Sequence, residues 1–124
     1  MSRQERYGTR DLTYSKWHRT LADDLTYIDV DALEYCQRCR EPLALIEIAR
    51  DVGQSFKATP VLRKLAARAG VPAYCALYRI EDDTVVSFRV RKLVPVFTDW
   101  CDIDTDGWVK LLRLFRDQHQ CELV

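Results

Sequence analysis

The sequence predicts an α/β (α+β) domain, with a single mixed β-sheet of about four strands flanked by helices in the order α-β-β-α-β-β-α. Three observations support this fold class. Two apolar runs of alternating character flank a short polar segment within residues 26–51. A third apolar run, VPAYCALYRI, follows an amphipathic stretch that ends in glycine, and a fourth run, VVSFRVRKLVPVF, comes directly after an acidic turn.

The size and charge of the chain limit its class. Its 124 residues suit one domain, and we expect residues 1–10 to be a flexible segment and residues 11–124 to form a single domain. Lys plus Arg and Asp plus Glu both number 19, which argues against a protein that coats nucleic acid but not against one that contacts a few phosphates. We find no membrane-spanning run and no secretory signal, so we expect a cytoplasmic protein whose five cysteines are reduced.

The N-terminal half begins with a predicted helix and a strand pair. Residues 11–23 indicate a short amphipathic helix, and the strand pair spans residues 26–51. The expected buried side of this helix consists of Leu12, Tyr14, Trp17 and Leu21.

A second helix is predicted within the segment 53–70, preceded by Gly53 and ended by Gly70. Gly70 stands at the expected C′ position, and Pro60 fits the first turn with Thr59 as its cap. The apolar stripe of this helix consists of Leu62, Leu65, Ala66 and Ala69.

The C-terminal half is predicted to contain two strands and a helix. Residues 71–80 form an apolar strand with a buried Cys75, residues 81–84 a turn and residues 85–97 an alternating strand. Residues 98–107 are expected to be an acidic loop, followed by a helix that runs from Gly107 to Cys121. Its inward side chains are expected to be Trp108, Leu111, Leu112 and Phe115.

Three acidic residues interrupt the first strand pair. Asp29 and Asp31 share one face of the first strand, because successive side chains of a strand point to opposite faces. If residues whose numbers sum to 78 are paired, Asp31 lies directly opposite Glu47. Like charges at that range are costly unless a cation lies between them, so the three carboxylates predict a Mg²⁺ or Mn²⁺ site. The alternative is that they belong to the solvent face of a half-exposed sheet.

The element order, with acids on the first strand pair, resembles the PD-(D/E)XK nuclease-like superfamily, in particular its Holliday-junction-resolvase-type members and small phage-encoded relatives. The resembling segment runs from about Thr26 to Val94. Asp29 or Asp31 matches the motif's aspartate and Glu47 its second acid. The resemblance implies a restriction-endonuclease-like fold and a metal that activates water against a DNA phosphodiester.

One motif position departs from that family. The motif has lysine two residues after the second acid, where this chain has Ala49. That lysine offsets developing negative charge, and Lys57 is the candidate to replace it from the following helix. Loss of the lysine together with loss of catalysis is the alternative.

Cys36 and Cys39 form a CQRC segment at the predicted hairpin tip. This spacing can present two thiolates to one Zn²⁺, but a structural zinc site needs four ligands. Cys101, His119 and Cys121 could complete it only if the fold brings them to the tip. We therefore expect free thiols, or at most an incomplete site, and no bound Zn²⁺.

These observations lead to two functional hypotheses. The first is a divalent-metal-dependent DNA endonuclease or resolvase-like hydrolase, encoded by a phage or mobile element, with Asp31, Glu47 and Lys57 as catalytic residues. Asp29 would assist Asp31 and Glu47 as a metal ligand. Its candidate phosphate contacts are Arg50, Lys64, Arg68, Arg89 and Arg91. The second hypothesis is a catalytically inactive nuclease-like fold that binds a protein partner or a second copy of itself.

Overall fold

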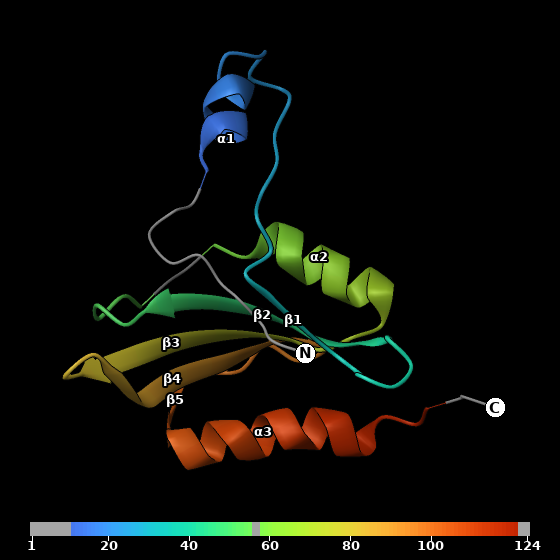
Figure 1. Cartoon of the computed structure of the whole chain (residues 1–124), viewed down its shortest axis with the longest axis vertical. Helices are drawn as coiled ribbons and strands as arrows, with labels where there is room; N and C mark the ends of the chain where they lie inside the picture. Colours follow the sequence, from blue (N-terminus) through green and yellow to red (C-terminus); the bar gives the residue numbers. More distant parts are fainter. Residues whose placement is uncertain (1–10, 56–57, 122–124) are drawn as a thin grey trace.

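The structure of the chain is a computed structural model that describes residues 11–55 and 58–121. It is an α+β fold in which one mixed sheet lies between two helices (Figure 1). The strands follow one another across the sheet in sequence order: β1 (Ala32–Tyr35), β2 (Pro42–Arg50), β3 (Ala73–Glu81), β4 (Thr84–Val94) and β5 (Cys101–Asp104). The helices are α1 (Thr13–His18), α2 (Pro60–Ala69) and α3 (Thr105–Gln118). The predicted class is confirmed, with five strands in the described part of the chain rather than four.

A crossover through α2 makes β2 and β3 parallel, whereas the other neighbouring strands are antiparallel. Pro60 is in the first turn of α2 and Gly70 ends the helix with φ of 72°, as predicted. Thr59 is at the cap position, but its side chain makes no capping hydrogen bond. The helical segment predicted after Gly53 is therefore too long at its N-terminal end, whereas the start at Pro60 that the same prediction offered is confirmed.

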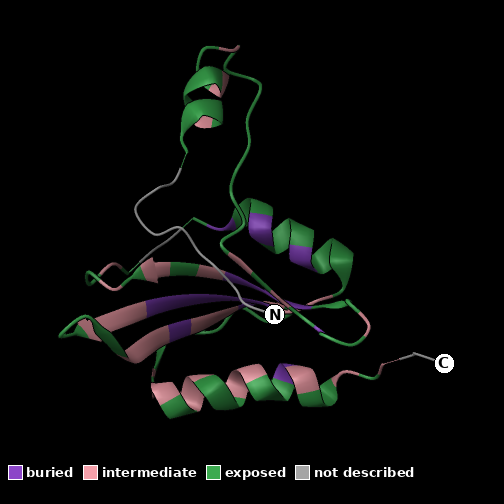
Figure 2. Ribbon diagram, viewed as in Figure 1, coloured by how far each residue is buried: buried purple, intermediate pink, exposed green. Residues whose placement is uncertain are grey.

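The sheet separates the core into two clusters, one under each helix (Figure 2). On the α3 side, Phe115 packs on Ile46 and Tyr74, with the other predicted inward residues of α3 partly buried around it. On the α2 side, Leu62 and Ala66 pack on Cys75. The remaining members of the predicted α2 stripe, Leu65 and Ala69, are exposed. The alternation of strand side chains thus assigns each β2 residue to one helix or the other.

The register predicted for the first hairpin is confirmed. Ala32 pairs with Ile46, and Leu33 with Leu45, so paired numbers sum to 78. The first strand is shorter than predicted, because residues 26–31 are outside the ladder. They form the return path from α1 to the sheet.

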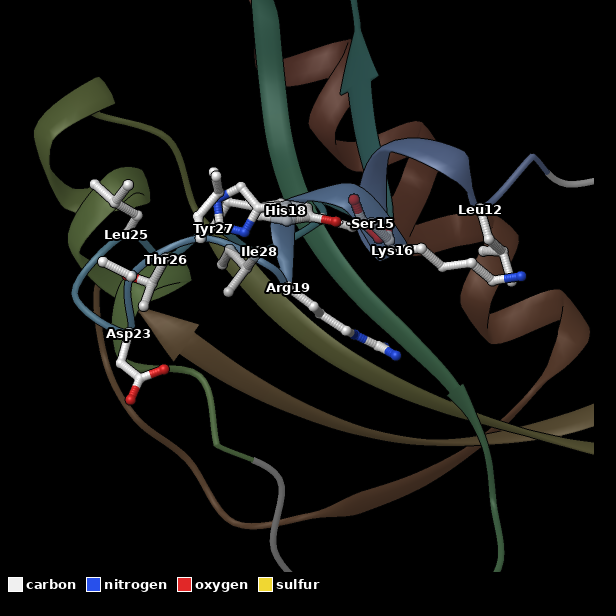
Figure 3. A pocket seen from close by; sticks show the side chains of 13 residues that line it. Leu12, Ser15, Lys16, His18, Arg19, Asp23, Leu25, Thr26, Tyr27 and Ile28 are labelled. Carbon is white, nitrogen blue, oxygen red and sulfur yellow. Dashed lines mark hydrogen bonds between the residues drawn. The ribbon is translucent and has the colours of Figure 1, made fainter.

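The buried side predicted for α1 is wrong. This helix has six residues, none of them buried, and it stands away from the sheet (Figure 1). Its aromatic residues contact the returning segment instead: the Tyr27 ring lies 4.6 Å from that of His18, and its hydroxyl 2.5 Å from that of Ser15. A wide cavity of about 630 Å³ is lined by α1 and by the segment that returns from it to the sheet. Lys16 and Arg19 extend away from the His18–Tyr27 pair in this cavity (Figure 3).

The predicted acidic loop contains the edge strand β5, and this changes the bounds of the last helix. The Asp104 carboxylate accepts a hydrogen bond of 2.7 Å from the Gly107 amide and so caps α3, which begins at Thr105. The helix ends at Gln118, three residues before the predicted end, so His119 and Cys121 are outside it. Within the described ranges, no helix has the length and apolar character needed to cross a membrane.

Candidate metal centre

The connection between β1 and β2 is a tight turn that carries two thiols. The Cys36 amide donates to the Glu41 carbonyl at 2.9 Å, and the Arg40 amide donates to the Cys36 carbonyl at 2.8 Å. Arg40 closes the turn in the left-handed region, with φ of 68°. This compact backbone presents the side chains of Cys36 and Cys39 together, as two metal ligands three residues apart require.

The chain that follows α3 brings the other half of the site. His119 Nε2 lies 3.0 Å from Cys39 Sγ, and Cys121 Sγ lies 3.3 Å from Cys36 Sγ. Both contacts join residues at least 80 positions apart in the sequence. Figure 1 shows the β1–β2 connection and the chain after α3 at the same end of the molecule.

The four ligand atoms form a compact group. They all lie within 4.8 Å of one another. In a tetrahedral Zn²⁺ site with Zn–S bonds of about 2.3 Å, the sulfur atoms are about 3.8 Å apart. The thiols are free, because 3.3 Å is far longer than the disulfide bond length of about 2.05 Å. Three sulfurs and one imidazole nitrogen are a donor set typical of structural zinc.

The environment of this cluster favours a thiolate at Cys36. Cys36 is fully buried beside Phe115 in the α3-side cluster, and Cys39 and Cys121 pack at its border. The backbone amide of Cys39 and the Cys121 thiol donate hydrogen bonds that lower the pKa of Cys36 to about 6. The proximity of Cys36, together with burial, raises the pKa of Cys121 to about 11.

The cofactor prediction is therefore wrong. We expected Mg²⁺ or Mn²⁺ and no Zn²⁺, but the group of metal-ligating side chains that the described residues bring together is Cys36, Cys39, His119 and Cys121. This soft donor set is suited to Zn²⁺, whereas Mg²⁺ and Mn²⁺ prefer oxygen ligands. The thiols are free as expected, but the expectation of an incomplete ligand set failed, because the helix prediction placed the last two ligands inside α3.

The predicted carboxylates of Asp29, Asp31 and Glu47 are not part of that group. Asp31 precedes β1, and its exposed carboxylate accepts a 2.9 Å hydrogen bond from the Ile48 amide. Glu47 is half-buried on the α2 side of the sheet, and Asp29 is exposed on the returning segment. Lys57 lies outside the described residues. The catalytic roles given to these residues stay predictions.

The five predicted phosphate contacts are dispersed. Arg50 is exposed on the face opposite Glu47, and Lys64 and Arg68 are exposed on α2. Arg89 and Arg91 are half-buried on the α2 side, because they pair across the strands with Leu77 and Cys75 of that cluster. The structure therefore does not bring the five cations onto one surface.

An ion-pair network that the sequence did not suggest lies near this face. The Asp51 side chain is only 7% exposed and meets both Arg79 and Arg89 at 3.0 Å. It also accepts a 2.9 Å hydrogen bond from the Gly53 amide. The hydrogen bond from Arg89, followed by the one from Gly53, holds the pKa of the Asp51 carboxyl far below its usual range. Arg89 is thus engaged within the protein.

Comparisons with known proteins add no assignment: no protein-family model, curated protein or solved structure matches this chain.

Proposed function

We propose that this chain is a zinc-binding domain in which one Zn²⁺ has a structural role. The observation that carries the proposal is the convergence of four ligand atoms, within 4.8 Å of one another, from the hairpin turn and the C-terminal segment. All four tetrahedral positions are filled by protein groups. Such a closed site leaves no position for a reacting water, which is the distinction between structural and catalytic zinc.

The zinc would link the chain that follows α3 to the β1–β2 connection of the sheet. The turn that holds Cys36 and Cys39 belongs to the edge strand pair, whereas His119 and Cys121 follow α3 directly. A metal that bridges these segments binds the folded chain and not the unfolded one, so its binding free energy adds to the free energy of unfolding.

Metal analysis of freshly purified protein tests this proposal. We expect one zinc per chain, and its loss in Cys39→Ser and Cys121→Ser variants. The matched control is Cys101→Ser, because Cys101 is an exposed free cysteine outside the cluster. The proposal is wrong if the wild type contains no zinc and takes up none, or if both ligand variants keep it.

A second candidate function rests on the hairpin. We propose that the domain is a PD-(D/E)XK-like, restriction-endonuclease-like fold that acts on DNA. The hypothesis is supported by the β1–β2 register, whose terminal pair, Ala32 with Ile46, is one position short of Asp31 and Glu47. The parallel β2–β3 pair with α2 as its crossover agrees with the element order of that resemblance. Ala49 at the lysine position weighs against catalysis.

A cleavage assay separates the DNA hydrolase from its alternative, a catalytically inactive nuclease-like fold that binds a partner. If the hairpin is catalytic, the purified protein should cut linear, branched or single-stranded DNA in buffers with or without divalent cations. Glu47→Gln should remove this activity, whereas Glu34→Gln on β1 should keep it. If the wild type leaves all three substrates intact, the hydrolase is excluded and the non-catalytic binding module is favoured.

A further inference from the structure

A small cavity lies on the α2 side of the sheet, away from the cysteine cluster on the α3 side. It measures about 280 Å³ and opens between the start of α2, strand β4 and the chain that follows β4. Its chemistry comes from two arginines, two aromatic rings and a hydroxyl group. These residues are Arg63, Arg91, Phe97, Trp100 and Thr59.

The aromatic rings hold the guanidinium groups in place. Arg91 Cζ lies 4.5 Å from the Phe97 ring centroid and 4.9 Å from that of Trp100. Arg63 Cζ lies 4.8 Å from the same Phe97 ring. The Arg91 Nε also donates a 2.7 Å hydrogen bond to the Thr98 carbonyl. The two cations are thus oriented before any ligand arrives, which lowers the entropic cost of binding an anion.

The positive charge at this cavity is poorly neutralised. The ion pair of Arg91 is with Asp99, at 4.0 Å, and that carboxylate is fully exposed and therefore screened by water. Arg63 makes no ion pair within residues 11–55 and 58–121. The first turn of α2 also contains no acidic residue. An anion here would meet two cations and the positive end of the helix dipole.

The Thr59 hydroxyl is the second indication of a ligand. Thr59 is only 9% exposed, lines the cavity, and its hydroxyl has no hydrogen-bond partner among the described residues. No buried side-chain oxygen or nitrogen lacks a partner among the described residues, so this hydroxyl must reach accessible space, where a ligand or water can bind it. Pro60 has no amide hydrogen and the Arg63 amide bonds the Thr59 carbonyl, so the amides of Val61 and Leu62 are the ones without a carbonyl within the helix. All these donors lie at the same end of α2.

From this arrangement we propose that the cavity is a binding site for a phosphate group. The guanidinium groups supply paired donors that match phosphate oxygens, and Thr59 and the start of α2 supply the remaining ones. Both rings already carry a guanidinium, so a base would not stack on them. The site therefore recognises the phosphate and not the base, whether it comes from a mononucleotide or from the end of a nucleic acid.

Calorimetry on the purified protein, with whatever metal it contains, tests this site. The ligands are inorganic phosphate, adenosine 5′-monophosphate, adenosine, and one short single-stranded oligonucleotide with and without a 5′-phosphate. We expect phosphate and the monophosphate to bind and adenosine not to bind. Arg63→Gln should weaken binding roughly tenfold, the effect of one lost charge-assisted contact, and Thr59→Val should weaken it less. Arg68→Gln is the matched control, because Arg68 is exposed on the same helix but does not line the cavity.

The outcomes are distinct. Stronger binding of the 5′-phosphorylated oligonucleotide than of the monophosphate would support the site and identify a nucleic-acid end as the source. Equal affinity would support it with a small phosphorylated ligand. If phosphate and monophosphate fail to bind at millimolar concentration, or if Arg63→Gln and Arg68→Gln weaken binding equally, the proposal is wrong. A zinc result of either sign leaves these outcomes unchanged, because the cluster is on the other side of the sheet.

Discussion

At the scale of single residues, Asp51 combines a nearly buried carboxylate with two ion pairs. Its nearly buried carboxylate is shared by Arg79 and Arg89. We predict that Asp51→Asn lowers the free energy of unfolding by about 3 kcal/mol at pH 7, because it leaves the half-buried Arg89 without its carboxylate partner and Arg79 with only the exposed Asp102. Asp102→Asn, whose carboxylate is 70% exposed beside Arg79, should cost less than about 1 kcal/mol. Urea denaturation measures both, and equal losses would contradict this account.

The same carboxylate gives a defined pH dependence. Because the pKa of Asp51 is lowered in the folded state, its contribution is fully present above the ordinary aspartate pKa of about 3.9. The contribution is lost as the pH falls through the folded pKa. The difference between wild type and Asp51→Asn should therefore be constant from pH 7 to about pH 5 and shrink below about pH 4.

Residue patterns alone predicted a different set of acids. Asp29, Asp31 and Glu47 were selected because they interrupt apolar runs, whereas Asp51 ends its run and resembles an ordinary strand terminus. Asp51 differs from such a terminus because it forms ion pairs with Arg79 and Arg89, which belong to two other strands. Such a partnership depends on the β2–β3 and β3–β4 registers, which no local pattern specifies.

At the scale of elements, the sequence predicted the ends that have strong local markers. Pro60 and Gly70 mark both ends of α2, and the EDDT segment marks a hairpin in which Asp82 and Asp83 both have positive φ. Strand β5 was missed because its CDID sequence has the composition of a loop. The end of α3 was missed because RDQHQ contains no glycine or proline. This error placed His119 and Cys121, the second half of the metal centre, inside the helix.

The start of α3 offers a test of the corrected boundary. We predict that Asp104→Ala destabilises the protein by about 1 kcal/mol, because the Gly107 amide loses its 2.7 Å hydrogen bond to the cap. Asp106→Ala, an acidic residue in the first turn that does not cap the helix, should cost about 0.5 kcal/mol through the dipole alone. Thermal unfolding at neutral pH distinguishes them. A smaller effect at Asp104 than at Asp106 would place the helix start elsewhere.

At the scale of the whole molecule, the sheet separates the candidate metal centre from the candidate phosphate site. The thiols of the cluster are beside the α3-side core, whereas the arginines and the threonine of the cavity are beside the α2-side core. Changes at one site therefore reach the other only through the sheet. The cluster of Cys36, Cys39, His119 and Cys121 joins the β1–β2 connection to the chain after α3, so loss of a bound metal should first affect these two segments.

Removal of the metal should therefore destabilise the β1–β2 connection and the C-terminal half of α3 and leave α2 unchanged. We predict that a chelator lowers the melting temperature by about 10 °C, which corresponds to about 3 kcal/mol for a chain of this size. Acidification below about pH 6 should have a similar effect, because protons compete with Zn²⁺ for the ligands. In hydrogen exchange, protection should be lost at residues 36–41 and at the C-terminal half of α3, while α2 keeps its protection. The Cys121→Ser variant should resemble the chelated protein and no longer respond to chelator, whereas Cys101→Ser should behave as the wild type. If chelation instead loosens α2 as much as α3, the metal does not fasten the hairpin to the C-terminal segment.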